Sequence, residues 1–202
     1  MITTPCQRLI SNQSLILSYI KDKLDIINFI MLGYNNNLPV LINNGFLHSA
    51  THVYYRSIIV EVCTLFDNHK FQSNNFHLLI NEDKKYSKEL TSNAIEFIKE
   101  KLLDSKNYFL EEIINIRNEE VSHFRFKDGT KISLNHEYLD ELNNLFDLAK
   151  QIIKISQYGF KDTTKCSDHM IGLSGHSLDS LQRLLKKASG FDYKSVWKID
   201  NE

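Results

Sequence analysis

The sequence is poor in the two residues that most often interrupt regular structure. Only two prolines and seven glycines occur among its 202 residues. Collagen-like chains, low-complexity chains and all-β folds with many tight turns all depend on these residues. Their scarcity argues against these three classes. Apolar residues make up 42% of the chain and charged residues 24%, as in folded globular proteins, so we do not expect global disorder.

Cysteine and net charge are also low. The three cysteines, Cys6, Cys63 and Cys166, lie far apart and include no Cys-x-x-Cys pair. An odd, sparse set of this kind argues against a disulfide framework and favours a reducing compartment. A net charge of −1 excludes a histone-like or strongly polybasic nucleic-acid binder, but it leaves room for a local basic patch that contacts RNA.

Long apolar runs are missing as well, because Lys, Asp, Asn or Glu interrupts each of them. The first residues, MITTPCQRLISNQS, lack the basic and then apolar regions of a secretory signal. We therefore expect no membrane-spanning segment and no contact with a membrane. The sequence predicts a cytoplasmic protein, and its length fits one domain or one domain with a small appendage.

Apolar residues recur at steps of three and four through most of the chain, which predicts an all-α fold. Helices are expected at about 10–32, 45–67, 87–103, 106–123, 135–156 and 177–190. Residues 68–86 are expected to form a loop with a short apolar patch, and 124–133 a small hairpin around Asp128-Gly129. We predict a helical bundle of five to six helices over 1–158, with a C-terminal extension over 159–202 that carries one short helix.

The most informative motif is Arg117-Asn118-x4-His123, at the end of a predicted helix. The guanidinium of Arg117 can hold a phosphate with its planar fork of donors, and the imidazole of His123 can transfer a proton near neutral pH. Asn118 can orient either group. These residues suffice for RNA cleavage without metal, in which a 2′-hydroxyl attacks the neighbouring phosphorus and Arg117 stabilises the charge on the phosphorane.

Helical geometry separates the two catalytic candidates. Six positions leave Arg117 and His123 about 120° apart around an ideal helix, so one narrow face cannot hold both. The long Arg117 side chain can wrap around the helix, the helix can loosen near Ser122, or two chains can each contribute a residue. A symmetric dimer is the simplest of these, because it duplicates the motif around one cleft. In the simpler alternative, Arg117 pairs with Glu120 or another acid and His123 only marks a helix end. Arg117 shares its predicted face with apolar residues: Leu110, Ile114 and Val121.

The Arg-Asn-x4-His string on a late helix of an all-α bundle resembles the motif of the HEPN superfamily. The resemblance is closer to the abortive-infection U-type (AbiU-like) branch, in which an earlier helix ends in a leucine-rich string that closes with Asp. Here that string is YRSIIVEVCTLFD, at 55–67, and the likeness covers roughly 46–156.

This resemblance implies a metal-independent endoribonuclease without cofactor, acting in toxin–antitoxin or phage-defence (abortive-infection) systems. Arg117 and His123 become the catalytic pair, with Asn118 as the polar residue after the arginine. The expected partners are an RNA substrate, a second copy of the chain in a homodimer, and an antitoxin protein.

One position departs from the family pattern. Many HEPN toxins paired with a nucleotidyltransferase antitoxin have a tyrosine two positions after the histidine, where this chain has Arg125. Neutralisation by modification of that tyrosine is therefore not expected. Arg125, Lys127 and Lys131 form a basic patch beside His123 that is suited to RNA phosphates, although a solvated turn is the simpler interpretation.

Other groups of polar residues point less clearly to chemistry. His48 and His52 are spaced by four residues, and Cys166, His169 and His176 form a loose Cys-x2-His-x6-His string. Neither set completes a recognisable zinc pattern, so no metal site is expected.

Two other functions remain open. In one, the same bundle is a catalytically inactive, HEPN-like dimeric module that binds RNA or protein; in the other, the chain is purely structural. Asp67, Asn68 and His69 are interpreted as a helix end rather than as catalytic residues.

Overall fold

The computed structural model describes residues 4–35, 45–69, 73–118, 136–162 and 176–189. Within these ranges every regular element is helical, and the only strand-like pairing is an isolated antiparallel bridge between Leu90 and Phe160. The helices are α1 (Pro5–Asn35), α3 (Gly45–Phe66), α4 (Phe76–Glu82), α5 (Ser92–Asp104), α6 (Leu110–Ile116), α7 (His136–Tyr158) and α8 (His176–Ser189). Two short turns complete them, the π-type η1 (Asp83–Ser87) and the 3₁₀-type η2 (Ser105–Tyr108). The predicted all-α fold is confirmed.

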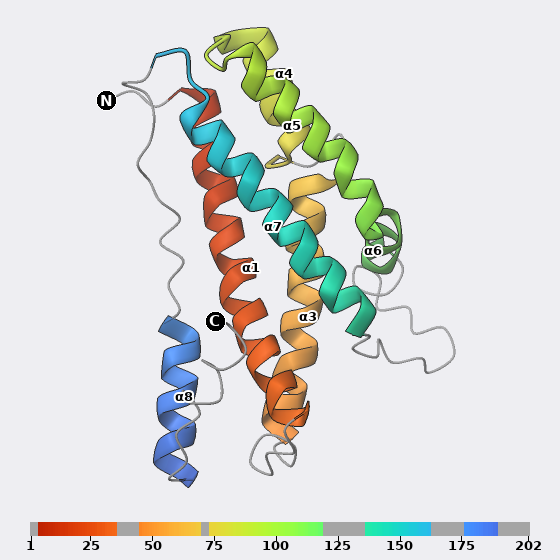
Figure 1. Cartoon of the computed structure of the whole chain (residues 1–202), viewed down its shortest axis with the longest axis vertical. Coiled ribbons are helices and arrows are strands. Elements are labelled where there is room, and N and C mark those ends of the chain that lie inside the picture. The colour runs from red at the N-terminus through yellow and green to blue at the C-terminus, as the bar shows by residue number, and fades with distance from the viewer. Residues whose placement is uncertain (1–3, 36–44, 70–72, 119–135, 163–175, 190–202) are drawn as a thin grey trace.

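Three long helices, α1, α3 and α7, run side by side, and α5 packs against α7 (Figure 1). Their shared core consists of aliphatic side chains at the predicted three- and four-residue steps, for example Ile20, Leu24, Ile27, Ile58, Leu65, Leu142 and Ile153. Each such side chain contributes about 1.5–3 kcal/mol on burial, so this cluster is the main source of stability. None of the described helices is long and apolar enough to cross a membrane.

The segment predicted as a loop over 68–86 contains a further helix, so that prediction was wrong from residue 76 onward. Phe76 and Leu79 of α4 are completely buried, and the ring of Phe76 packs edge-on against Phe66 at a centroid distance of 5.3 Å. Asn75 begins the helix, and its side chain accepts a hydrogen bond from the backbone N–H of Leu78 at 2.6 Å. A short apolar patch and one capping residue are enough here because α1, α3 and α5 supply the packing surface.

The helix predicted over 106–123 begins later than expected. Phe109 adopts a left-handed conformation, with φ 50°, and separates η2 from α6. Such a conformation is uncommon for a bulky residue, and the spacing of apolar residues in the sequence does not reveal it. After α6, the backbone widens into π-type turns at Arg117 and Asn118, where the described part of this segment ends. Local π-type geometry of this kind is frequent at functional sites.

The C-terminal helix packs on the bundle. Figure 1 shows α8 beside the lower part of α1. Leu178 of α8 is buried against a face of α1 that includes Ile26, Phe29 and Ile30. The apolar stripe of α8 therefore faces α1, which is the only described element that α8 contacts extensively. The division of the chain at residue 158 stays a prediction, and the predicted hairpin over 124–133 lies outside the described residues.

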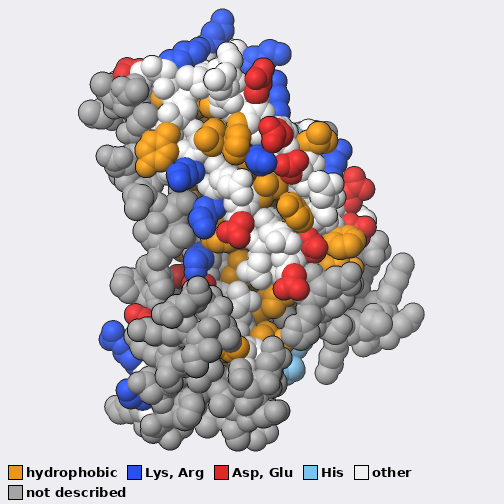
Figure 2. Space-filling model, viewed as in Figure 1, with side chains coloured by type: hydrophobic (Ala, Val, Ile, Leu, Met, Phe, Trp, Pro, Cys, Tyr) orange, Lys and Arg blue, Asp and Glu red, His pale blue; other side chains and the backbone are white. Residues whose placement is uncertain are grey.

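The surface mixes both signs of charge. Figure 2 shows acidic, basic and hydrophobic side chains interspersed on the viewed face. This distribution agrees with the net charge of −1 and with the absence of a polybasic composition.

Candidate functional site

The first element of the site is an ion pair that joins the ends of two helices. Nη2 of Arg117, just after α6, lies 2.8 Å from Oδ2 of Asp67, just after α3. The two side chains are only 13% and 15% exposed. Partial burial strengthens the attraction between the charges and makes the loss of either partner costly.

The neighbouring amide completes the support of the guanidinium. Oδ1 of Asn118 accepts hydrogen bonds from Nε and Nη2 of Arg117, at 3.1 and 2.8 Å. The third nitrogen, Nη1, is buried and has no hydrogen-bond partner among the described residues. Buried donors are almost always paired in folded proteins, so Nη1 stands out as an unsatisfied donor within the described residues.

Cys63 lies one turn before Asp67 on α3 and is completely buried. Burial raises the pKa of its thiol to about 12, although the positive charge of Arg117 partly opposes this. Its Sγ lies 3.8 Å from the carbonyl oxygen of Ile113. A thiol that stays protonated is a poor nucleophile, so Cys63 links α3 to α6 and does not act as a catalytic cysteine.

His77 is a second histidine near the ion pair, contributed by α4. Its pKa is lowered chiefly by burial, while the negative charge of Asp67 and a hydrogen bond to the backbone of Phe66 raise it. The positive charge of Lys106 adds to the lowering. The net direction keeps the imidazole of His77 neutral at physiological pH.

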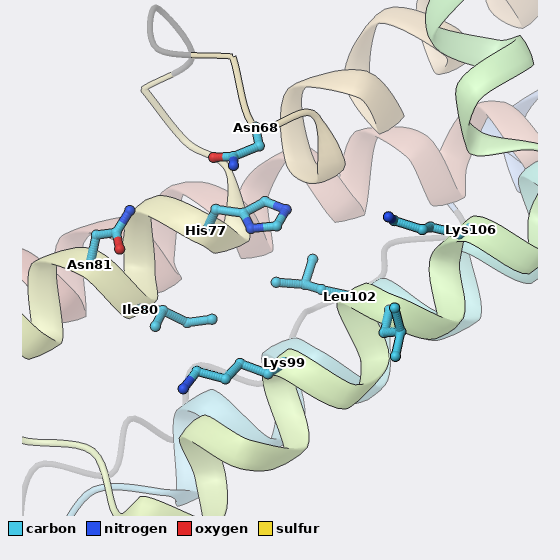
Figure 3. Close-up of a pocket in the computed structure, with 8 residues that line it drawn as sticks. Asn68, His77, Ile80, Asn81, Lys99, Leu102 and Lys106 are labelled. Atoms are coloured by element: carbon cyan, nitrogen blue, oxygen red, sulfur yellow. The ribbon is translucent and has the colours of Figure 1, made fainter.

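A groove of about 390 Å³ lies beside these residues, between α4 on one side and α5 with η2 on the other. Its lining consists of Asn68, His77, Ile80, Asn81, Lys99, Leu102, Leu103 and Lys106. Figure 3 shows the side chains of His77 and Lys106 directed into the same space from opposite walls. Asn68 directly follows Asp67, so the groove borders the ion pair.

The predicted site residues fall into two groups. Arg117 and Asn118 lie together and contact one another, whereas His123, Arg125, Lys127 and Lys131 lie outside the described residues. The sequence interpretation of Asp67 as a helix end was incomplete, because its side chain is also the acidic partner of Arg117. The leucine-rich string that ends in Asp67 was the sequence feature that could have indicated a role for this carboxylate in the site.

The remaining histidine pair does not build a metal site. Nε2 of His48 and Nε2 of His52 lie 3.3 Å apart on an exposed face of α3. Across the described parts of the chain, no group of three or more His, Cys, Asp or Glu side chains is placed to hold a metal ion. Cys166 and His169 lie outside those parts.

No protein-family model, curated protein or solved structure matches this chain. The resemblance to the HEPN superfamily therefore stays an expectation from the two sequence strings.

Proposed function

We propose that this protein is a metal-independent endoribonuclease of the HEPN type that acts in the cytoplasm as a toxin or phage-defence effector. The main observation that supports this proposal is the Arg117–Asp67 ion pair. Fifty residues separate its partners, yet each belongs to one of the two strings that resemble the family. The packing of α3 against α6 brings the two strings into contact, as a shared active site requires.

The chemistry follows from the support of the guanidinium. Asp67 and Asn118 engage Nε and Nη2 of Arg117, which restricts the rotation of the side chain, while Nη1 has no partner among the described residues. A positioned cation of this kind stabilises the negative charge that develops on the phosphorane. Less rotational freedom is lost when substrate binds, because the side chain is already oriented.

Proton transfer is assigned to His123. The 2′-hydroxyl gives up its proton as its oxygen bonds to the adjacent phosphorus, and the bond from phosphorus to the 5′-oxygen breaks. The departing 5′-oxygen receives a proton, so the products carry a 2′,3′-cyclic phosphate and a 5′-hydroxyl. A histidine that exchanges protons near neutral pH suits either proton transfer.

Dimerisation brings two copies of the motif together. Three exposed apolar residues, Phe46, Val53 and Val60, follow one another at seven-residue steps on one face of α3. The next position in this series is Asp67. A two-fold interface along this face covers the apolar side chains and brings the two Arg117–Asp67 pairs toward the same axis.

The competing function is an inactive RNA- or protein-binding dimer. One observation favours it, namely that Asp67 already neutralises the charge of Arg117. A screen of cellular RNA with the purified chain separates the two functions. The nuclease gives 2′,3′-cyclic phosphate and 5′-hydroxyl ends, with and without EDTA. Wild-type protein that binds RNA and cleaves none of it supports the binding module instead.

A further inference from the structure

We propose that the groove between α4 and α5 docks an acidic amphipathic helix of a protein partner, with apolar side chains in the groove and carboxylates against Lys99 and Lys106. This inference goes beyond the proposed function and does not depend on RNA cleavage. Neither α4 nor α5 contributes a residue of the Arg117-Asn118-x4-His123 motif, so the groove is a separate surface.

Each wall of the groove is one face of a helix. His77 and Ile80 lie three positions apart on α4. The other wall consists of residues at steps of three and four along α5 and η2, namely Lys99, Leu102, Leu103 and Lys106. Residues with this spacing share a helix face. Figure 3 shows the two walls on either side of an open space, an arrangement that can accept the apolar face of a third helix.

The apolar part of the groove is open to a partner. Leu103 is 65% exposed and Ile80 is only partly buried, and both line the groove together with the buried Leu102. A single exposed leucine is ordinary, but three aliphatic side chains around one concavity provide a contact for apolar side chains of a partner. The volume of about 390 Å³ admits a few anchoring side chains and excludes a complete helix, which is how a helix docks along a groove.

The charge of the groove selects an acidic partner. Lys99 and Lys106 line it, and its described lining contains no carboxylate. No ion pair among the described residues includes either lysine, whereas Lys101, between them in sequence, pairs with Asp104. Seven positions separate Lys99 from Lys106, which is about two helical turns or ~10 Å. Two carboxylates seven positions apart on a partner helix have the same spacing, so both lysines can be paired at once.

The rim of the groove is polar, as in protein interfaces in general. The side-chain amides of Asn68 and Asn81 are exposed there, and each supplies both donors and an acceptor. Asn68 directly follows Asp67, the partner of Arg117, so a docked helix would lie beside that ion pair.

Two other occupants fit the groove less well. A two-fold contact between the grooves of two copies would place the lysines of one copy against those of the other, and these like charges would repel. Single-stranded RNA stacks its bases mainly on aromatic side chains, and the described lining holds no Phe, Tyr or Trp. The aliphatic lining instead suits the leucine-like side chains of an amphipathic helix.

The test uses full-length protein and a fluorescent peptide of about 18 residues, long enough to form a helix. The peptide carries leucines at i, i+3, i+4 and i+7 and glutamates beside them, seven positions apart. A second peptide has lysine in place of each glutamate. Fluorescence anisotropy measures both dissociation constants, and NMR follows the His77 ring in the groove. We expect the acidic peptide to bind at least about tenfold more tightly than the basic peptide and to shift the His77 signals.

Matched variants assign the binding to the groove. Leu103→Ser should weaken binding of the acidic peptide at least about fivefold, whereas Leu184→Ser, at a leucine of nearly equal exposure on α8, should bind as the wild type does. The double variant Lys99→Glu/Lys106→Glu should reverse the preference, so that the basic peptide binds more tightly than the acidic one. Lys150→Glu is the charge control, since Lys150 is an exposed lysine outside the groove, and it should keep the preference of the wild type.

Three results would overturn the proposal. The first is an acidic peptide that does not bind, or binds no better than the basic peptide. The second is binding that Leu103→Ser and the double variant leave unchanged. The third is a labelled single-stranded RNA that binds the wild type and not the double variant while the acidic peptide binds neither, which would assign the groove to RNA instead.

Discussion

Nη2 of Arg117 lies 2.8 Å from Oδ2 of Asp67, and this ion pair joins the end of α6 to the end of α3. The carboxylate holds the guanidinium in place. If the proposed cleavage holds, Asp67 acts as a positioning residue, and its substitution should affect the rate of cleavage through Arg117.

Asp67→Asn should lower kcat for RNA cleavage about tenfold or more, with a smaller change in KM, because a misplaced guanidinium stabilises the transition state poorly. Asp67→Glu should restore part of kcat, since it keeps the charge. Asp147→Asn is the control, because Asp147 makes only a 3.5 Å exposed pair with Lys150. Equal kcat in Asp67→Asn and wild type, measured on folded protein, would remove Asp67 from the mechanism.

The assembly prediction concerns the exposed α3 stripe of Phe46, Val53 and Val60. Light scattering at micromolar concentration should give a dimer for the wild type and a monomer for Val53→Glu, because a charge cannot be buried in an apolar interface without compensation. Leu184→Glu, at an exposed leucine of α8, should remain dimeric. A monomeric wild type would count strongly against a composite active site.

Gly159 sits where the chain leaves α7 and approaches α5. A Cβ at this position would lie 2.5 Å from Cβ of Ala94 and 2.6 Å from the carbonyl oxygen of Ile155. Gly159→Ala should therefore lower the free energy of unfolding by about 1–3 kcal/mol. At Gly45 a Cβ meets no described atom within 4 Å, so Gly45→Ala should be neutral or slightly stabilising. Denaturant titration of the two variants measures the difference, and equal stabilities would contradict the packing described.

The buried thiol of Cys63 predicts a pH dependence of stability. Its pKa is about 12 in the folded chain, above the ordinary value of 9.0, so the unfolded state loses the proton first as pH rises. Stability is therefore unaffected by this group below pH 9 and falls between about pH 9 and 12. Wild type should lose about 1–2 kcal/mol more than Cys63→Ala between pH 8 and 10.5. If the unfolding free energies of the two proteins change equally with pH, the pKa of the Cys63 thiol is not raised in the folded chain.

The long helices could be predicted from the sequence because each repeats its apolar residues over several turns, as Ile20, Leu24 and Ile27 do in α1. α4 has only seven residues, so its pattern was too short to distinguish a helix from an apolar patch in a loop. The left-handed backbone at Phe109 does not disturb the spacing of apolar residues, so the sequence gives no indication of it.

Part of the candidate site, the adjacent pair Arg117 and Asn118, could also be predicted from the sequence. Arg117 and Asn118 belong to one short string, so their proximity followed from the sequence. The partnership of Arg117 with Asp67 depends on how α3 and α6 pack, and the groove depends on how α4 meets α5. Neither relationship exists until residues distant in sequence are brought together.

The central claim is that Arg117 and His123 perform the cleavage together, and the rates of their alanine variants on a cleavable RNA test it most directly. His123→Ala and Arg117→Ala should each lower the rate by at least ~10², the usual scale for losing one proton-transfer group or one charge-stabilising donor. Wild type should keep its rate in EDTA. A folded His123→Ala protein that cleaves as fast as the wild type would contradict the account.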